Sequence, residues 1–261
     1  MHRDDLDHWY SNGIDLRARV LYLGNIAMND EVAETCDPGI HWNTARRAIM
    51  GLHVLETPKK QDPITIILNS CGGDWSHGMA IHNAIRACKN HVTIINMSHA
   101  RSMTSIIYQA GDLRITAPDG YYMIHDGVTT EEGIPRTVAN SMNYEVDVML
   151  PRMYQVYLDR LKELDEDGEP KVDVRDAMDI LNPKMPKGAK LITARGGINS
   201  IKLDHIQQLC AQDTYFTPDE MVKLNFADRI LERGDLAGAY RNPKMAGLPT
   251  GLSSLYEDEE E

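Results

Sequence analysis

The chain has 261 residues, 42 % of them hydrophobic, which is enough to bury the core of one domain. Its formal net charge of −12 argues against a nucleic-acid partner, because binding to phosphates needs an excess of Lys and Arg. A mean hydropathy of −0.40 and the lack of a long uncharged apolar run predict no membrane span. The polar first residues are unlike a signal peptide, and the four cysteines show no pairing or zinc spacing. We therefore expect a cytoplasmic protein with neither a metal nor another cofactor.

The first half of the chain alternates short apolar runs with helical patterns. The runs that predict buried strands lie at 20–24, 64–68, 92–97, 113–116 and 121–124. The segments with helical spacing are 29–56, which has a break at 37–39, then 78–89, and the residues after Ser102. Strands and helices that alternate in this way are typical of βαβ units, so we predict an α/β fold with a largely parallel sheet.

A longer pattern begins at Val138. From there apolar residues recur every three or four positions, with one longer step before the last, at Val138, Met142, Val146, Met149, Met153, Val156 and Leu164. We predict one long amphipathic helix over about 136–164, kinked near Pro151. An apolar stripe of this length predicts packing against another subunit, with Met149 and Met153 in the seam.

The segment from about 165 to 199 is rich in Asp, Lys, Pro and Gly and looks like an insertion. Its acidic start, Asp165-Glu-Asp-Gly-Glu-Pro170, does not fit a calcium loop, because the glycine is at the wrong offset and no bidentate glutamate follows. Further helices are predicted near 200–210 and 218–225. We expect a single domain over 1–232 and a C-terminal extension over 233–261 that ends in an acidic tail.

Ser102 stands between the strand at 92–97 and an apolar helical segment. A helix N-terminus has unpaired N–H groups and partial positive charge, so it can stabilise an oxyanion beside a serine hydroxyl. Serine is also a common helix cap, which is the simpler interpretation. Downstream lie Met123-Ile-His125 and Gln212-Asp213, and serine, histidine and aspartate are the parts of a hydrolytic triad.

A glycine turn, Asn69-Ser-Cys-Gly-Gly73, follows the strand at 64–68. Two adjacent glycines allow positive φ and a close approach to a bound chain. Its N–H groups could supply one oxyanion donor beside the N–H of Met103; the alternative is a plain turn from strand to helix. It is not a phosphate loop, since neither G-x-G-x-x-G nor a Lys-Ser/Thr pair is present.

Together these motifs resemble the ClpP-type caseinolytic protease family, the serine peptidase subunits of compartmentalised proteases. The matching segments are the glycine turn with Gly78-Met-Ala-Ile81, His99-Ala-Arg-Ser-Met-Thr104, Met123-Ile-His125, and Asp213 with Tyr215-Phe-Thr-Pro218. They occur in the family's order, and the resemblance covers roughly residues 10–164 and 200–232. It implies a ClpP/crotonase-like fold in which the long helix is the family's protruding handle.

The resemblance also assigns roles. It implies that Ser102 is the nucleophile, His125 the general base and then acid, and Asp213 the group that orients the imidazole. The backbone N–H groups of Gly73 and Met103 would bind the oxyanion. It further implies a serine endopeptidase that acts on unfolded proteins or peptides inside heptameric rings stacked as a tetradecamer. An AAA+ unfoldase is the partner that could feed such a chamber.

The chain departs from the family's pattern at Cys71, where proline is usual, at Arg101, where a small residue is usual, and at Thr104, where glycine is usual. The segment 165–199 lengthens the gap between His125 and Asp213. Three other functions stay open: a catalytically silent subunit of a mixed ring, a phage capsid-maturation protease, and a crotonase-type acyl-CoA enzyme. The three triad residue types argue against the silent subunit, and the lack of a nucleotide-binding signature argues against the acyl-CoA enzyme.

Overall fold

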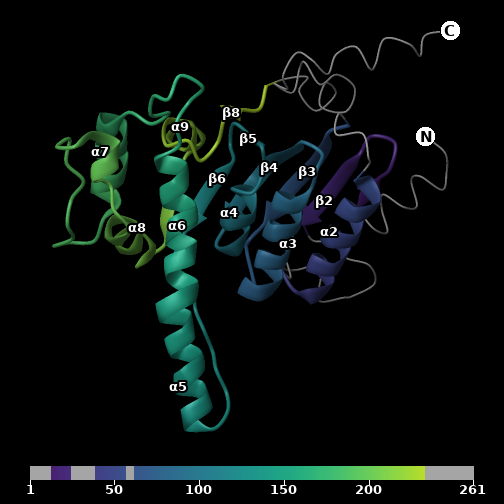
Figure 1. Ribbon diagram of the computed structural model, residues 1–261, viewed down its shortest axis with the longest axis horizontal. Coiled ribbons are helices and arrows are strands. Elements are labelled where there is room, and N and C mark those ends of the chain that lie inside the picture. The colour runs from purple at the N-terminus through teal and green to yellow at the C-terminus, as the bar shows by residue number, and fades with distance from the viewer. Residues whose placement is uncertain (1–12, 25–38, 57–61, 233–261) are drawn as a thin grey trace. The chain divides into compact units, whose positions relative to one another are not determined.

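The computed structural model describes residues 13–24, 39–56 and 62–232 (Figure 1). They form two compact units: Tyr122–Phe226 make unit 2, and the described residues on either side of that stretch make unit 1. The expected tail at 233–261 and the first part of the helical pattern, 29–38, lie outside the described residues. Within the described ranges, no helix is both long and apolar enough to cross a membrane.

Unit 1 is built on a sheet with strand order β1-β2-β3-β4-β5-β8. All neighbours from β2 to β8 are parallel, and β1 is antiparallel to β2. This arrangement confirms the predicted α/β class and its largely parallel sheet. The strands are β1 (Ile14–Asp15), β2 (Val20–Gly24), β3 (Ile64–Ser70), β4 (Val92–Arg101), β5 (Leu113–Thr116) and β8 (Arg229–Ile230).

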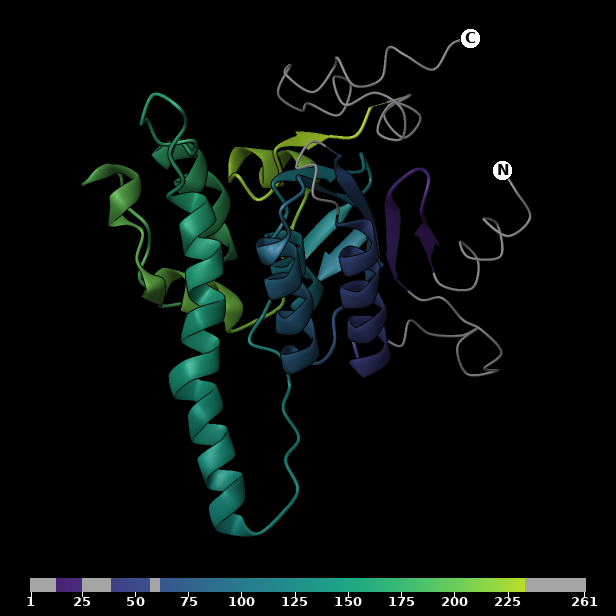
Figure 2. The same ribbon diagram turned by 45° about the vertical axis from the view of Figure 1, so that its right-hand side comes forward.

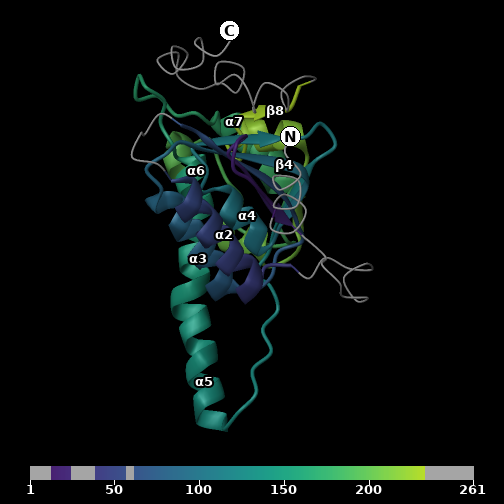
Figure 3. The ribbon, with the colours of Figure 1, turned by 90° about the vertical axis from the view of Figure 1, so that its right-hand side faces the viewer.

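Three helices lie on one side of this sheet, as Figures 1 and 3 show: α2 (Trp42–Leu55), α3 (Trp75–Ala87) and α4 (Met103–Tyr108). α3 begins three residues before the predicted start, because the Asp74 carboxylate accepts the N–H of His77 at 2.8 Å and caps the first turn. Gly51 of α2 lies directly over β2, since a Cβ there would come within 2.4 Å of the Leu21 side chain.

β4 is longer than predicted and reaches Arg101. Its register against β3 shifts on the way: Leu68 is opposite Asn96, whereas Ser70 is opposite Ala100. Four steps along β4 therefore match two along β3. Irregularities of this kind bend a strand and redirect its end. Here the shift brings the end of β4 to the level of the glycine turn that follows β3.

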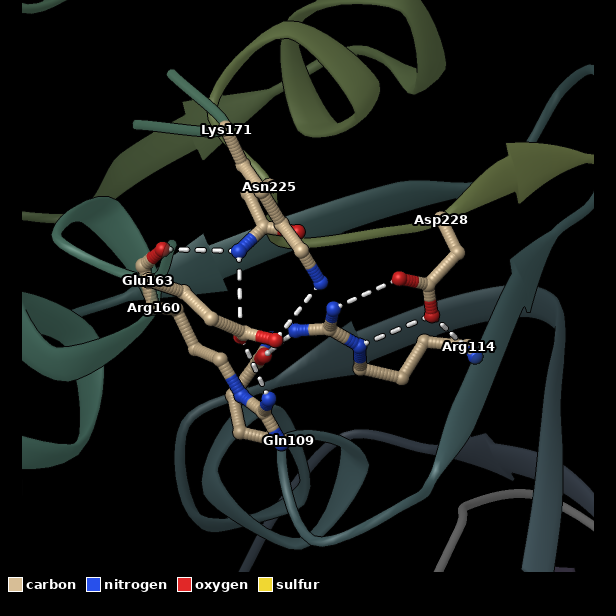
Figure 4. Close-up of polar contacts among 7 residues, drawn as sticks. All are labelled: Gln109, Arg114, Arg160, Glu163, Lys171, Asn225 and Asp228. Atoms are coloured by element: carbon tan, nitrogen blue, oxygen red, sulfur yellow. Dashed lines mark hydrogen bonds and ion pairs between the residues drawn. The ribbon is translucent and has the colours of Figure 1, made fainter. Parts of the chain in front are cut away.

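A buried arginine ties β5 to the segment before β8. Arg114 is 1 % exposed and forms a two-pronged ion pair with Asp228, through Nη2 at 2.7 Å and Nε at 3.0 Å (Figure 4). Its Nη1 donates to Oε1 of Gln109 at 2.9 Å. Because every arm of the guanidinium has an acceptor, the buried charge is compensated.

Unit 2 contains an antiparallel strand pair and a set of helices. β6 (Tyr121–Ile124), which enters unit 2 at Tyr122, pairs with β7 (Thr214–Phe216), a strand that the sequence patterns did not predict. Four rings pack on one another at centroid distances of 5.3–6.4 Å, those of Tyr122, Tyr157, Phe216 and Phe226. The helices are α5 (Pro135–Tyr144), α6 (Leu150–Leu161), α7 (Val174–Leu181), α8 (Leu203–Cys210) and α9 (Pro218–Lys223).

The predicted long helix is present as α5, a π-helical segment over Glu145–Met149, and α6 (Figures 1 and 2). The widened segment ends at Met149, two residues before Pro151, whose ring would clash with the carbonyl four residues earlier in a regular helix. α5 has no buried residue, whereas α6 buries five side chains in unit 2. Placing Met153 in a seam between subunits was therefore wrong: it is 5 % exposed and belongs to the core of its own unit.

The segment 165–199 contributes to the core of unit 2, with buried Val172, Leu181, Ile192 and Ile198. Its acidic start folds as a turn in which one Asp165 oxygen accepts the N–H groups of Asp167 and Glu169. That carboxylate caps its own loop.

A second polar network ties α6 to the segment that follows α9. Asn225 donates to the Arg160 carbonyl at 2.8 Å and to Glu163 at 3.1 Å (Figure 4). Glu163 also forms ion pairs with Arg160 and Lys171. The end of the long helix is therefore held by several polar contacts within unit 2.

Candidate active site

Ser102 lies in unit 1, between the end of β4 and the first turn of α4. Its backbone has φ 53° and ψ −129°, a conformation that residues with a Cβ rarely adopt and that costs about 1–3 kcal/mol. Its side chain makes no capping hydrogen bond to α4, so the simpler interpretation as a helix cap does not apply. The chain instead makes a sharp, strained turn at this serine, and Ser105 bonds back to the Ser102 carbonyl through both its N–H and its hydroxyl.

The glycine turn packs directly against Ser102. Gly72 has φ 108° and Gly73 φ 143°, and a Cβ on Gly72 would come within 2.6 Å of the Ser102 Cβ. The turn is held by Ile40, whose N–H donates to the Gly72 carbonyl at 2.6 Å and whose carbonyl accepts the N–H of Asp74 at 2.8 Å. These two bonds do not use the N–H of Gly73.

Met103, the residue after the serine, occupies the first position of α4 and is 3 % exposed. Its side chain fills the space beside Gly78 of α3, where a Cβ would come within 2.1 Å of the Met103 Cγ. The first N–H groups of a helix have no acceptor within that helix. The N–H of Met103 therefore has no acceptor within α4, and Met103 is the residue that follows Ser102.

His125 and Asp213 lie in unit 2 and are in direct contact, with 2.9 Å between Nδ1 and Oδ1. The strand register explains the contact. Ile124 is opposite Thr214 in the antiparallel β6–β7 pair, so the next residue on one strand faces the preceding residue on the other. His125 is mostly buried and Asp213 is exposed, with side chains 21 % and 56 % accessible. An imidazole that donates from Nδ1 to a carboxylate presents Nε2 as its basic nitrogen.

A further carboxylate stands beside this pair. The N–H of Asp126 donates to the Cys210 carbonyl at 2.7 Å, and the Tyr154 hydroxyl donates to Oδ1 of Asp126 at 2.7 Å. Burial raises the pKa of the Asp126 carboxyl, while the Tyr154 hydrogen bond and the charge of His125 lower it. Burial, and then Asp126 itself, raise the pKa of Tyr154 far above its ordinary value. The motifs gave no indication of Tyr154, which is not among the recurring apolar positions predicted for the long helix.

The structure thus brings the expected site residues together in two groups. Ser102, Met103 and Gly73 belong to unit 1, and His125 and Asp213 belong to unit 2. Among the residues with described positions, no three His, Cys, Asp or Glu side chains are grouped so that they could hold a metal ion. Cys71, the departure within the glycine turn, is half-buried.

Comparison with known proteins indicates the family to which this chain belongs. The sequence model of the Clp protease family matches residues 25–179, more than half of the chain, a range that contains Ser102 and His125 and ends before Asp213. The chain is 28 % identical over 152 residues to the ATP-dependent Clp protease proteolytic subunit of Bdellovibrio bacteriovorus, a match that covers 56 % of this chain and 66 % of that protein.

Two further relatives carry similar names. The chain is 29 % identical over 120 residues to the chloroplastic ATP-dependent Clp protease proteolytic subunit 3 of Arabidopsis thaliana, which covers 45 % of this chain and 35 % of that protein. It is 29 % identical over 119 residues to the ATP-dependent Clp protease proteolytic subunit 2 of Treponema denticola, covering 42 % and 60 %. The chain spans less than two thirds of the length of each of these relatives. On the strength of the family match, the chain belongs to the Clp protease family.

Proposed function

We propose that this protein is a serine endopeptidase that hydrolyses peptide bonds of unfolded proteins or peptides through Ser102, His125 and Asp213. The observation that carries the proposal is the 2.9 Å hydrogen bond between His125 and Asp213, which are 88 residues apart in the chain. Histidine held in this way is a competent general base. The family match and the names of the relatives as proteolytic subunits support the same activity.

In the proposed reaction, Oγ of Ser102 attacks the scissile carbonyl while Nε2 of His125 takes the hydroxyl proton. Asp213 keeps the proton of the imidazole on Nδ1 and stabilises the imidazolium. The N–H groups of Gly73 and Met103 bind the oxyanion of the tetrahedral intermediate. His125 then protonates the leaving amine, and water releases the acyl group from Ser102 by the same steps. The reaction requires Nε2 and Oγ to approach to about 2.6–3.2 Å.

The proposal includes a homo-oligomer of heptameric rings stacked as a tetradecamer in the cytoplasm, with an AAA+ unfoldase as the partner that delivers substrates. The support from the chain itself is the first half of the long helix, which has an exposed apolar surface. Its members are 45–70 % exposed: Ile134, Met142, Tyr144, Val146 and Val148. Surfaces of this kind are typical of contacts between subunits.

Labelling with a fluorophosphonate probe, together with hydrolysis of a fluorogenic peptide, tests the activity. We expect the wild type to be labelled at Ser102, and Ser102→Ala to abolish both labelling and hydrolysis while the particle mass is unchanged. His125→Ala should lose about as much, and the double variant little more, because triad members act as a unit. Ser76→Ala, on the exposed side of α3, is the matched control. A wild type that assembles but is neither labelled nor active would instead identify a structural subunit.

A further inference from the structure

The chain around His125 is held at two points that the triad does not use. Both lie at Asp126, the next residue: its N–H donates to the carbonyl of Cys210, the last residue of α8, and its carboxylate accepts the hydroxyl of Tyr154 on α6. Each distance is 2.7 Å. α6 and α8 lie side by side in unit 2 (Figure 1). Asp126 therefore connects the residue after His125 to both helices.

The position of these bonds along the chain gives them their importance. The β6–β7 ladder ends at the pair Ile124 and Thr214, so His125 is already past the last paired residue. Directly after Asp126 the chain becomes exposed to solvent: Gly127 has φ 86°, and Val128 is 93 % exposed. His125 is thus held between the end of a ladder on one side and Asp126 on the other. Without the bonds at Asp126, the exposed loop would begin at the histidine itself.

We propose that Asp126 and Tyr154 are positioning residues for His125: the Tyr154 hydroxyl holds the Asp126 carboxylate, which keeps the imidazole at the angle that Asp213 requires. The inference rests on the proposed function, since it gives these residues a role in the same reaction. Misplacing a catalytic group by about 1 Å can lower the rate about 10²-fold. A second contact that holds His125 in place can therefore affect kcat.

The charges around the link agree with this role. The groups that face Asp126 are the His125 imidazole, the Tyr154 hydroxyl and the buried Cys210 thiol, whose pKa is raised by burial and by Asp126. Because the pKa of Tyr154 is also raised, its hydroxyl stays protonated and can only donate to the carboxylate. The direction of the hydrogen bond is therefore constant over the pH range in which a histidine base works.

The test compares four variants and a control by steady-state hydrolysis of a fluorogenic peptide. Tyr154→Phe removes only the hydroxyl, and we expect kcat to fall about tenfold with KM within about twofold, because the loss is one of orientation. Asp126→Ala should lose about as much, and the double variant little more, since both changes break one contact. Asp126→Asn keeps an acceptor oxygen and should retain most of the activity. Gln155→Ala, at the exposed position of α6 next to Tyr154, is the control and should be unchanged.

Several outcomes overturn the inference. They are an unchanged kcat in Tyr154→Phe, losses that add up in the double variant, or a loss that appears in KM alone. A lowered kcat that follows the unfolded fraction of the variant, measured by circular dichroism at the assay temperature, would reduce the link to a stabilising contact. Failure of the proposed function is seen separately, because the wild type would then not be labelled at Ser102. That result would remove both proposals, whereas normal labelling with an unaffected Tyr154→Phe removes only this one.

Discussion

The two groups of candidate site residues are built by different means. In unit 1 the surroundings of Ser102 are mainly backbone: two glycines with positive φ, the strained serine, and N–H groups at a turn and a helix start. In unit 2 the groups around His125 are side chains: Asp213 contacts its Nδ1 at 2.9 Å, and the neighbouring Asp126 accepts the Tyr154 hydroxyl at 2.7 Å. We therefore expect activity to be lost around Ser102 when a substitution adds atoms, and around His125 when a substitution removes them.

The largest expected effect is in the side-chain group. Asp213→Asn removes the charge and the preference for the Nδ1-protonated imidazole, and kcat should fall by about 10⁴-fold if Asp213 acts as triad aspartates do. Asp179→Asn, at an exposed position of α7, is the control. A loss below about tenfold would mean that another carboxylate, such as Asp126, orients His125.

The backbone group is tested by adding a methyl group. Gly72→Ala would place a Cβ 2.6 Å from the Ser102 Cβ and 3.1 Å from the Met103 nitrogen. The turn must then move away from the serine, and kcat should fall by about 10²-fold or more, as when an oxyanion donor is displaced. Gly188→Ala shares the strain of a positive φ but has no atom within 4 Å of the new Cβ. Equal activity in the two variants would contradict the role of the glycine turn.

The two halves of the long helix differ in burial within unit 2, since α5 has no buried residue and α6 has five. Met153→Glu would bury an unpaired charge and should lower the free energy of unfolding by about 3 kcal/mol or more. Val146→Glu, at a side chain 59 % exposed, should change it by about 0.5 kcal/mol at most, yet reduce the size of the particle. Denaturant titration and light scattering measure the two effects. A full-sized particle with Val146→Glu would place the subunit contact elsewhere.

The smallest expected effect concerns Asp126. Its pKa is raised in the folded protein, so the folded state binds the proton more tightly than the unfolded chain, and ionisation of the carboxyl destabilises the fold. This destabilisation is absent below the unfolded value of 3.8 and develops as pH rises through the folded pKa. Asp126→Asn cannot ionise and should melt at or above the wild type at pH 7, with the difference disappearing below about pH 4. A difference independent of pH in thermal melts would contradict this.

Local pattern predicted most of the fold. The strands at 20–24, 64–68, 113–116 and 121–124 agree with β2, β3, β5 and β6, because an apolar run between turns is a property of neighbouring residues. The two-residue β8 and the three-residue β7 were missed, since segments so short have no measurable period. The stripe on the long helix was found, but its periodicity did not distinguish Met153 from Val146.

By itself, the sequence determined the types of the elements, their order, and the serine, histidine and aspartate that resemble a family's motifs. Those are carried by residues close together in the chain. Only the tertiary structure decided that His125 meets Asp213, because that contact depends on the register of β6 against β7. It also decided that the Tyr154 hydroxyl donates a hydrogen bond to Asp126, so that this side chain does more than fill an apolar core. The physical reason is that such contacts join residues from 28 to 88 positions apart in the chain. Strand pairing and helix packing decide whether such residues come close in space.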